Sequence, residues 1–216
     1  MKNLQYFFIN FLFILSLSSQ ENKLSDGPFS QLIIRGATLI NGNGSPPIGP
    51  VDIVVENNII KLISSVGYPG IAILENSRPK LKENGREINA EGMYILPGFI
   101  DMHGHIGGTS QGAEPDYVFT LWLAHGITTV REPSGRGIDY SLDLKNKSLK
   151  NEIIAPRLII YSGFGSDFKK EISTPELARE WVRFNAKKGA DGIKFFGSEP
   201  DIMIAALDEN NLLGLG

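Results

Sequence analysis

The sequence has 216 residues, 42% of them hydrophobic and 21% charged, and a formal net charge of −3. This composition is that of an ordinary globular protein of one or two domains, and it excludes a disordered or collagen-like chain. The lack of cysteine excludes disulfides, Cys-ligated zinc and a thiol nucleophile. With so small a net charge we expect no nucleic-acid partner. Imidazole chemistry is confined to three residues, His103, His105 and His125.

The first 18 residues have the pattern of a secretory signal peptide. Lys2 is followed by an apolar run from Tyr6 to Leu15 and then by small residues before a cleavage position after Ser18. The run is short for a hydrocarbon core of ~30 Å, although an uncleaved anchor helix is the alternative. We therefore expect an exported protein, periplasmic or secreted, with no membrane contact after cleavage. The lack of disulfides favours a bacterial periplasm.

The stretch after the signal carries short β-type runs without a helical period, at 31–35, 37–40, 51–55 and 59–64. Asn57 and Asn58 separate the last two runs, and asparagine tolerates the positive φ of a two-residue hairpin turn. Residues 76–88 are charged and rich in turn formers, which predicts an exposed excursion. The sequence thus predicts a small β-sandwich, or a half-barrel, over residues 19–92.

From residue 93 the chain alternates between strand-like and helix-like segments. Strands are predicted at 94–102, 127–131, 157–161 and 191–196. Helices are predicted at 119–125, from the capping box of Ser173 and Glu176 to a closing Gly189, and at 201–210. Residues 212–216 resemble the entry to one more strand. About four βα units with a parallel sheet follow, so the fold class is α/β.

The first candidate for chemistry is the pair His103 and His105, at the end of the strand predicted over 94–102. In extended backbone, side chains two residues apart point to the same face. Two imidazoles on one face can bind one metal ion, and in a barrel the carboxyl ends of the strands form the mouth of the active site. The alternative is a chance pair in a polar loop.

Five further residues have open interpretations. Lys194 lies in an apolar strand run, where a neutral amine could form a carbamate that bridges metals, but a strand-end lysine that reaches solvent is the simpler interpretation. Asp101 either lies near a metal or anchors backbone. His125 suits a helix C-terminus, because a cation there interacts well with the helix dipole. Arg131 and Glu132 end the second predicted strand, a position that would line the mouth.

Several stretches together resemble the metal-dependent amidohydrolase superfamily, with most similarity to its imidazolonepropionase-like and prolidase-like branch. The most specific stretch is LPGFIDMHGH, residues 96–105. The resemblance covers nearly all of residues 31–216, and its other segments are 32–42, 51–60, 88–95, 126–131 and 189–194.

This resemblance implies a composite β-domain followed by a (β/α)8 barrel. It implies that His103 and His105 bind one metal of a one- or two-metal centre, and that Lys194 is the carboxylated bridging ligand if two ions bind. Zinc is favoured, although such ligands also suit Mn, Co or Fe. The implied activity is hydrolysis of a carbon–nitrogen bond in a small amide-type substrate, a cyclic amide or a dipeptide, rather than of ordinary peptide bonds.

The resemblance is incomplete in one respect. The family pattern also requires histidine ligands after strands 5 and 6 and an aspartate general base after strand 8, yet no histidine follows His125. A full barrel takes ~250 residues. We therefore expect residues 93–216 to form the first half of an incomplete (β/α)8 TIM-type barrel, with no catalytic residue in this chain and the general-base Asp beyond Gly216.

Such a fragment or truncated form is expected to be inactive by itself and prone to aggregation, because native folds normally cover the edges of parallel sheets. The alternative is a non-catalytic exported binding protein, or a relic of an amidohydrolase. The sequence carries no signal for an oligomeric state.

Overall fold

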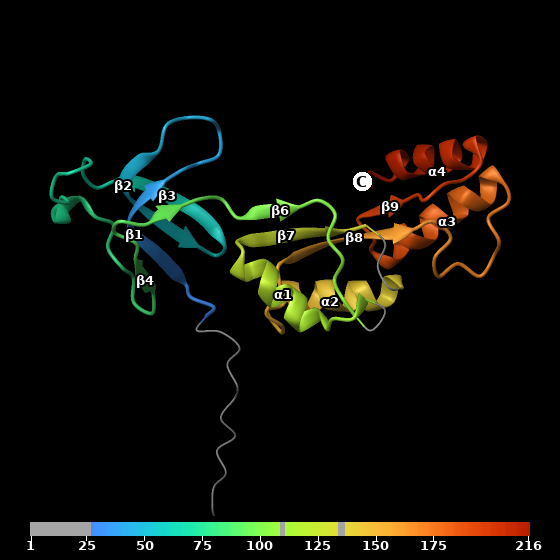
Figure 1. Cartoon of the computed structure of the whole chain (residues 1–216), viewed down its shortest axis with the longest axis horizontal. Coiled ribbons are helices and arrows are strands. Elements are labelled where there is room, and N and C mark those ends of the chain that lie inside the picture. Colours follow the sequence, from blue (N-terminus) through green and yellow to red (C-terminus); the bar gives the residue numbers. More distant parts are fainter. Residues whose placement is uncertain (1–26, 109–110, 134–136) are drawn as a thin grey trace, which may run out of the picture.

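The computed structural model describes residues 27–108, 111–133 and 137–216. Its strands form two separate sheets, one of five strands and one of four (Figure 1). The predicted signal peptide, residues 1–18, lies outside the described part of the chain. Among the helices that the structure describes, none has both the length and the apolar character needed to cross a membrane.

The first sheet is mixed, with the order β3-β2-β1-β4 and with β5 also paired to β1. Neighbours β1–β2 and β2–β3 are antiparallel, whereas β4 and β5 run parallel to β1. A one-turn 3-10 helix, η1 (Glu75–Ser77), precedes β4. The strands are β1 (Gln31–Leu39), β2 (Ile48–Glu56), β3 (Ile59–Ser65), β4 (Arg86–Asn89) and β5 (Tyr94–Ile95).

The hairpin between β2 and β3 is confirmed, since Asn57 and Asn58 have φ values of 51° and 62°. The two runs expected at 31–35 and 37–40 form one strand, with a register shift beside Gly36 (φ 73°). Part of the expected excursion is also strand, because β4 pairs with β1. Within the described ranges the sandwich is not seen, since this region contributes one sheet and no second sheet packed against it.

The second sheet is parallel throughout, with the order β6-β7-β8-β9, and a helix follows each strand. The strands are β6 (Phe99–Asp101), β7 (Ile127–Glu132), β8 (Arg157–Gly163) and β9 (Gly192–Lys194). The helices are α1 (Pro115–Ala124), α2 (Ile138–Leu149), α3 (Pro175–Lys188) and α4 (Pro200–Leu212). The α/β class and four βα units are therefore present, as in a partial TIM-type barrel.

The strand predicted over 94–102 is wrong as a single element. Its first residues form β5 in the first sheet and its later residues form β6 in the second. Pro97 lies between them and has no N–H to donate to a sheet ladder, so pairing stops there. This short connection links the two sheets (Figure 1).

The helices cover one face of the parallel sheet. On β8, Leu158 and Ile160 are buried in a cluster with Phe119 of α1 and Leu144 of α2. A second cluster, around the fully buried Trp181, joins α3 and α4 to β9. The alternate residues of β8 point away from these helices, toward the face that would be the inside of a barrel.

The last residue already pairs with the edge of β9. The Gly216 N–H donates to the Asp191 carbonyl (2.9 Å), and the Ile193 N–H donates to the Gly216 carbonyl (3.3 Å). This alternation is the pattern of a parallel ladder. The segment predicted as a strand entry thus begins as helix, because α4 extends to Leu212, and reaches strand-like pairing only at its end.

Candidate metal centre at the carboxyl edge of the parallel sheet

His103 and His105 lie just beyond the end of β6, and both are exposed. Their ring centroids are 5.4 Å apart and the rings are nearly perpendicular, at 85°. The Asp101 carboxylate accepts a hydrogen bond from the His103 N–H (2.9 Å). Of the two interpretations of Asp101, the structure therefore shows the anchoring of backbone, and this contact fixes the turn that brings the imidazoles side by side.

The end of the neighbouring strand β7 holds this histidine loop in place. Glu132, only 2% exposed, places Oε1 3.0 Å from His105 Nδ1 and accepts from the Ile106 N–H at Oε2 (2.7 Å). Arg131 donates from Nε to the Met102 carbonyl (2.7 Å). The Arg131 carbonyl in turn accepts from the Gly104 N–H (3.1 Å). The sequence placed Glu132 near the mouth but gave no hint of this contact.

Lys194 is the last residue of β9, at the carboxyl edge of the same sheet. Its ammonium lies 5.9 Å from the ring centroid of Phe196, and the side chain is half-buried. Three strand spacings separate β9 from β6, or about 14 Å measured along the sheet. Among the residues described, no hydrogen bond or ring contact joins Lys194 to either imidazole. The structure thus brings the two histidines together and leaves the lysine at the far strand.

His125 has the structural role expected of it. It caps the C-terminus of α1, where Nδ1 lies 2.7 Å from the Leu121 carbonyl oxygen. Because the helix runs antiparallel to the strands, this end lies at the amino edge of the sheet. Next to it, the Gly126 carbonyl accepts from the N–H of Phe99, the first residue of β6. His125 is therefore on the opposite edge from the histidine pair.

The paired imidazoles fit part of a divalent metal site. Because His105 meets Glu132 through Nδ1, its Nε2 is left for a ligand. Metal-binding histidines commonly use their second ring nitrogen in this way. A catalytic zinc takes three protein ligands. Within the described ranges, no group of three or more His, Cys, Asp and Glu side chains gathers around one point. His103 and His105 could therefore supply two ligands, fewer than such a site takes.

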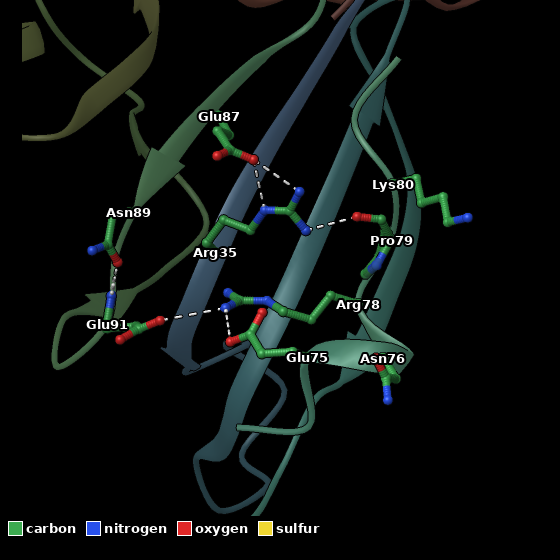
Figure 2. A pocket seen from close by; sticks show the side chains of 9 residues that line it. All are labelled: Arg35, Glu75, Asn76, Arg78, Pro79, Lys80, Glu87, Asn89 and Glu91. Carbon is green, nitrogen blue, oxygen red and sulfur yellow. Dashed lines mark hydrogen bonds and ion pairs between the residues drawn. The ribbon is translucent and has the colours of Figure 1, made fainter. Parts of the chain in front are cut away.

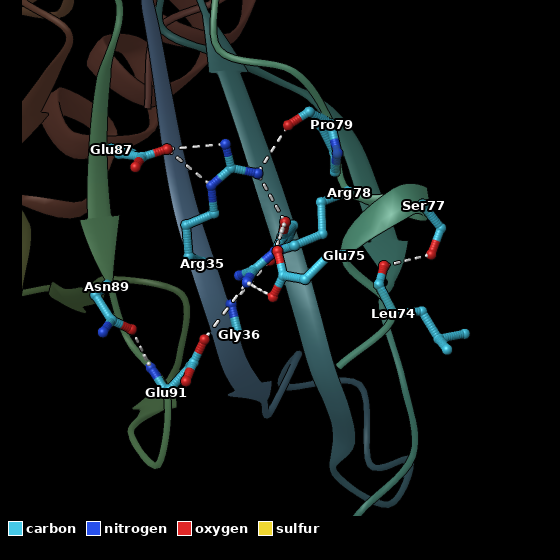
Figure 3. Close-up of polar contacts among 11 residues, drawn as sticks. Arg35, Gly36, Leu74, Glu75, Ser77, Arg78, Pro79, Glu87, Asn89 and Glu91 are labelled. Carbon is cyan, nitrogen blue, oxygen red and sulfur yellow. Dashed lines mark hydrogen bonds and ion pairs between the residues drawn. The ribbon is translucent and has the colours of Figure 1, made fainter. Parts of the chain in front are cut away.

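A second group of polar side chains lines a pocket on the first sheet. The pocket is lined by arginines and carboxylates that contact one another (Figure 2). Arg35 contacts Glu87 through Nε and Nη2, at 3.0 and 2.8 Å, and donates from Nη1 to the Pro79 carbonyl. Arg78 contacts Glu75 and Glu91 (Figure 3). Both guanidinium groups are thus paired with carboxylates of the same lining, which forms an ion cluster on this sheet.

The centre of this cluster is Asp52, whose side chain is fully buried. Burial alone would raise the pKa of Asp52, but hydrogen bonds from Arg78, Arg35 and the Gly36 N–H outweigh it and hold the pKa below its usual value. The cluster ties the segment after β3 to the strands β1 and β2.

Two curated proteins are similar in sequence to part of this chain. The chain is 34% identical over 110 residues to a 5-methylthioadenosine/S-adenosylhomocysteine deaminase from Caldicellulosiruptor saccharolyticus, covering 50% of this chain and 24% of that protein. It is 36% identical over 76 residues to a dihydroorotase from a Thermoanaerobacter species, covering 35% and 14%. No protein-family model matches the chain.

The solved structures with a similar fold include a prolidase-like protein from Bifidobacterium longum. It superposes with a TM-score of 0.64 at 21% identity, over 87% of this chain and 49% of that one. The chain thus spans about half of this neighbour and a smaller share of the curated relatives. The resemblance of this chain to the N-terminal portion of proteins of the amidohydrolase superfamily is thereby confirmed.

Proposed function

We propose that this chain is the N-terminal part of a metal-dependent hydrolase that cleaves a carbon–nitrogen bond in a small amide-type substrate. The observation that carries the proposal is the pair His103 and His105, side by side at the carboxyl edge of a parallel sheet and braced by Glu132. In barrels built of such βα units, active sites lie at this edge. The deaminase, dihydroorotase and prolidase-like relatives support the reaction class, because each name denotes a hydrolase of C–N bonds.

In this proposal His103 and His105 bind one divalent ion through their imidazoles, with zinc favoured. Such an ion polarises a carbonyl oxygen and lowers the pKa of a water molecule. Lys194 has a part only in a two-metal centre, where its carboxylated amine would bridge the ions. Its position at the same edge supports that role, and its distance along the sheet means that the curvature of the sheet must bring it closer.

We further propose that this chain has no hydrolytic activity by itself. Two imidazoles and one lysine are fewer groups than a two-metal centre with a general base requires. No third histidine occurs at this edge, since His125 lies at the amino edge. The remaining ligands and the general-base aspartate would come from residues other than these 216. We also propose export, on the signal pattern of residues 1–18 alone.

Titration of the metal-free chain with Zn²⁺ and Co²⁺ tests the proposed ligands. Calorimetry gives the affinity for either ion, and the visible absorption of bound Co²⁺ reports its ligands. We expect His103→Ala and His105→Ala each to weaken binding by about tenfold or more, because each removes one of a few protein ligands. His125→Ala is the matched control and should bind as the unchanged protein does. Equal loss in all three variants, or no loss in the first two, would contradict the site.

The inactive state is tested separately. The zinc-loaded chain is incubated with an Xaa-Pro dipeptide and with a cyclic amide, and product is followed by chromatography. We expect no turnover above that of the His103→Ala variant. Turnover that depends on His103 would show that the chain is complete as a catalyst and would refute this part of the proposal.

A further inference from the structure

The buried carboxylate of Glu132 contacts the histidine loop through both of its oxygens. Its two oxygens have different partners, with Oε1 3.0 Å from His105 Nδ1 and Oε2 2.7 Å from the Ile106 nitrogen. Both partners belong to the loop after β6, whereas Glu132 ends β7. The Glu132 side chain at the end of β7 thus contacts both the His105 ring and the backbone of the loop after β6.

The chemistry of these partners fixes the proton on the imidazole. A backbone N–H can only donate, so the Ile106 contact holds one carboxylate oxygen as an acceptor. The other oxygen of an ionised carboxylate also only accepts, so Nδ1 of His105 must carry a hydrogen. The neutral ring then has its lone pair on Nε2, which points away from Glu132 and is the only ring nitrogen able to bind a metal.

We propose that Glu132 is a positioning residue that holds His105 as the Nδ1–H tautomer and so prepares Nε2 to bind the metal. The metal itself rests on the proposed function, but the tautomer does not. Burial strengthens the effect, because a carboxylate removed from water requires partners that satisfy it. The same contact restricts rotation of the His105 ring, which otherwise would be free to turn at an exposed position.

Replacing Glu132 by glutamine gives a sharp expectation. The amide of Gln has one acceptor oxygen and one NH2 donor, and the fixed Ile106 N–H requires the oxygen. The NH2 then faces Nδ1 of His105, which can accept only by losing its hydrogen. In Glu132→Gln the His105 tautomer therefore switches to Nε2–H. The hydrogen on Nε2 then prevents this nitrogen from binding a metal. Glu132→Asp keeps a carboxylate and is expected to restore the original tautomer.

The tautomers are measured by long-range ¹H–¹⁵N NMR on the metal-free, ¹⁵N-labelled full chain. We expect the Nδ1–H pattern for His105 in the unchanged protein and in Glu132→Asp, and the Nε2–H pattern in Glu132→Gln. Glu171→Gln, at an exposed residue between β8 and α3, makes the same chemical change elsewhere and should leave the spectrum unaltered. A Nε2–H pattern in the unchanged protein overturns the proposal, and this measurement stands even if a variant fails to fold.

Zinc affinity is measured on the same four proteins by calorimetry. We expect a loss of about 10–100-fold in Glu132→Gln, with at least partial recovery in Glu132→Asp. If His105 is the Nδ1–H tautomer but the unchanged protein binds no zinc, the proposed metal centre fails while the positioning of the ring holds. If Glu132→Gln switches the tautomer and binds zinc as tightly as before, the link from positioning to the metal is refuted.

Discussion

Substitution of Asp52 by asparagine provides a strong test of what stabilises the first sheet. Oδ1 of Asp52 accepts from the Gly36 N–H (2.9 Å) and from Nη2 of Arg78 (3.1 Å). Oδ2 accepts from Nη1 of Arg35 (2.9 Å) and from Nε of Arg78 (3.0 Å). The Asp52 side chain is fully buried, and those of Arg35 and Arg78 are only 14% and 12% exposed. The carboxylate therefore has four donors and little contact with water.

The expected loss follows from these contacts. Asparagine keeps one oxygen, which can stay with Gly36, but it places an NH2 group where Oδ2 meets two guanidinium donors. Hydrogen bonds to charged groups contribute about 1.5–3 kcal/mol each, and removing one partner of a buried ion pair costs about 3–5 kcal/mol. We expect the free energy of unfolding of this sheet to fall by about 3–5 kcal/mol, a large share of the ~5–15 kcal/mol typical of native proteins.

The assay must report on this sheet alone. Both tryptophans, Trp122 in α1 and Trp181 in α3, lie in helices that pack on the parallel sheet. Tryptophan fluorescence therefore does not report on the first sheet. Amide hydrogen exchange at β1 and β2, with urea unfolding followed by far-ultraviolet circular dichroism, measures the loss directly. Glu87→Gln is the control, because Glu87 is an exposed partner of Arg35 and surface pairs contribute about 0–1 kcal/mol. An Asp52→Asn variant no less stable than this control would refute the reasoning.

Three other outcomes are expected. The pKa of Asp52 is lowered in the folded state, so the stability that the ionised carboxylate contributes is complete above about pH 4 and declines as the pH falls further. The stabilities of Asp52→Asn and of the unchanged protein, measured by acid unfolding, should therefore converge at low pH. A difference that stays constant with pH would contradict this. Trp181→Ala should cost about 3–5 kcal/mol in urea unfolding, since the fully buried indole fills the contact of α3 and α4, and a loss below 1 kcal/mol would be unexpected. Gly189→Ala should cost only about 1 kcal/mol in thermal unfolding, because its φ of 104° is strained for alanine while an added Cβ meets open space; no loss at all would mean that the helix end adjusts.

The elements that could be predicted from sequence are those with local signals. Helix α3 has Pro175 in its first turn and the positive-φ Gly189 after its last residue, and both ends are close to where the sequence placed them. Its cap is Thr174 rather than the expected Ser173, a shift of one residue that a capping motif alone does not resolve. The histidine pair was found because its spacing is short and its strand is apolar.

The elements that were missed depend on distant partners. No helix was predicted over α2 (Ile138–Leu149), whose sequence is polar and which follows Gly137 with a φ of 91° and no side-chain cap. It is fixed by tertiary packing, through buried residues such as Leu144. The charged residues Arg86 and Glu87 favour a surface excursion over most of β4, whereas its parallel pairing with β1 joins residues far apart in sequence.

The contact between Glu132 and His105 could have been predicted from the order of strands in a parallel sheet. It contacts His105 across 27 residues of sequence, so no motif of short spacing includes both. In a parallel sheet, however, residues that close neighbouring strands lie next to each other. Pairing the end of each predicted strand with the end of the next would have placed a carboxylate beside the histidines.

The candidate ligands differ in what holds them in position. The histidine pair needs only β6, the loop after it and the end of β7, because the contacts of Asp101 and Glu132 lie within these segments. Lys194 depends on the whole sheet, since about 14 Å of sheet separates its strand from β6, whereas metal–nitrogen bonds are about 2.0–2.1 Å and paired metals lie about 3.5–4 Å apart. A one-ion site at His103 and His105 would therefore depend on two strands only. A second ion bridged by Lys194 would form only where four strands curve enough to bring both ends of this edge together.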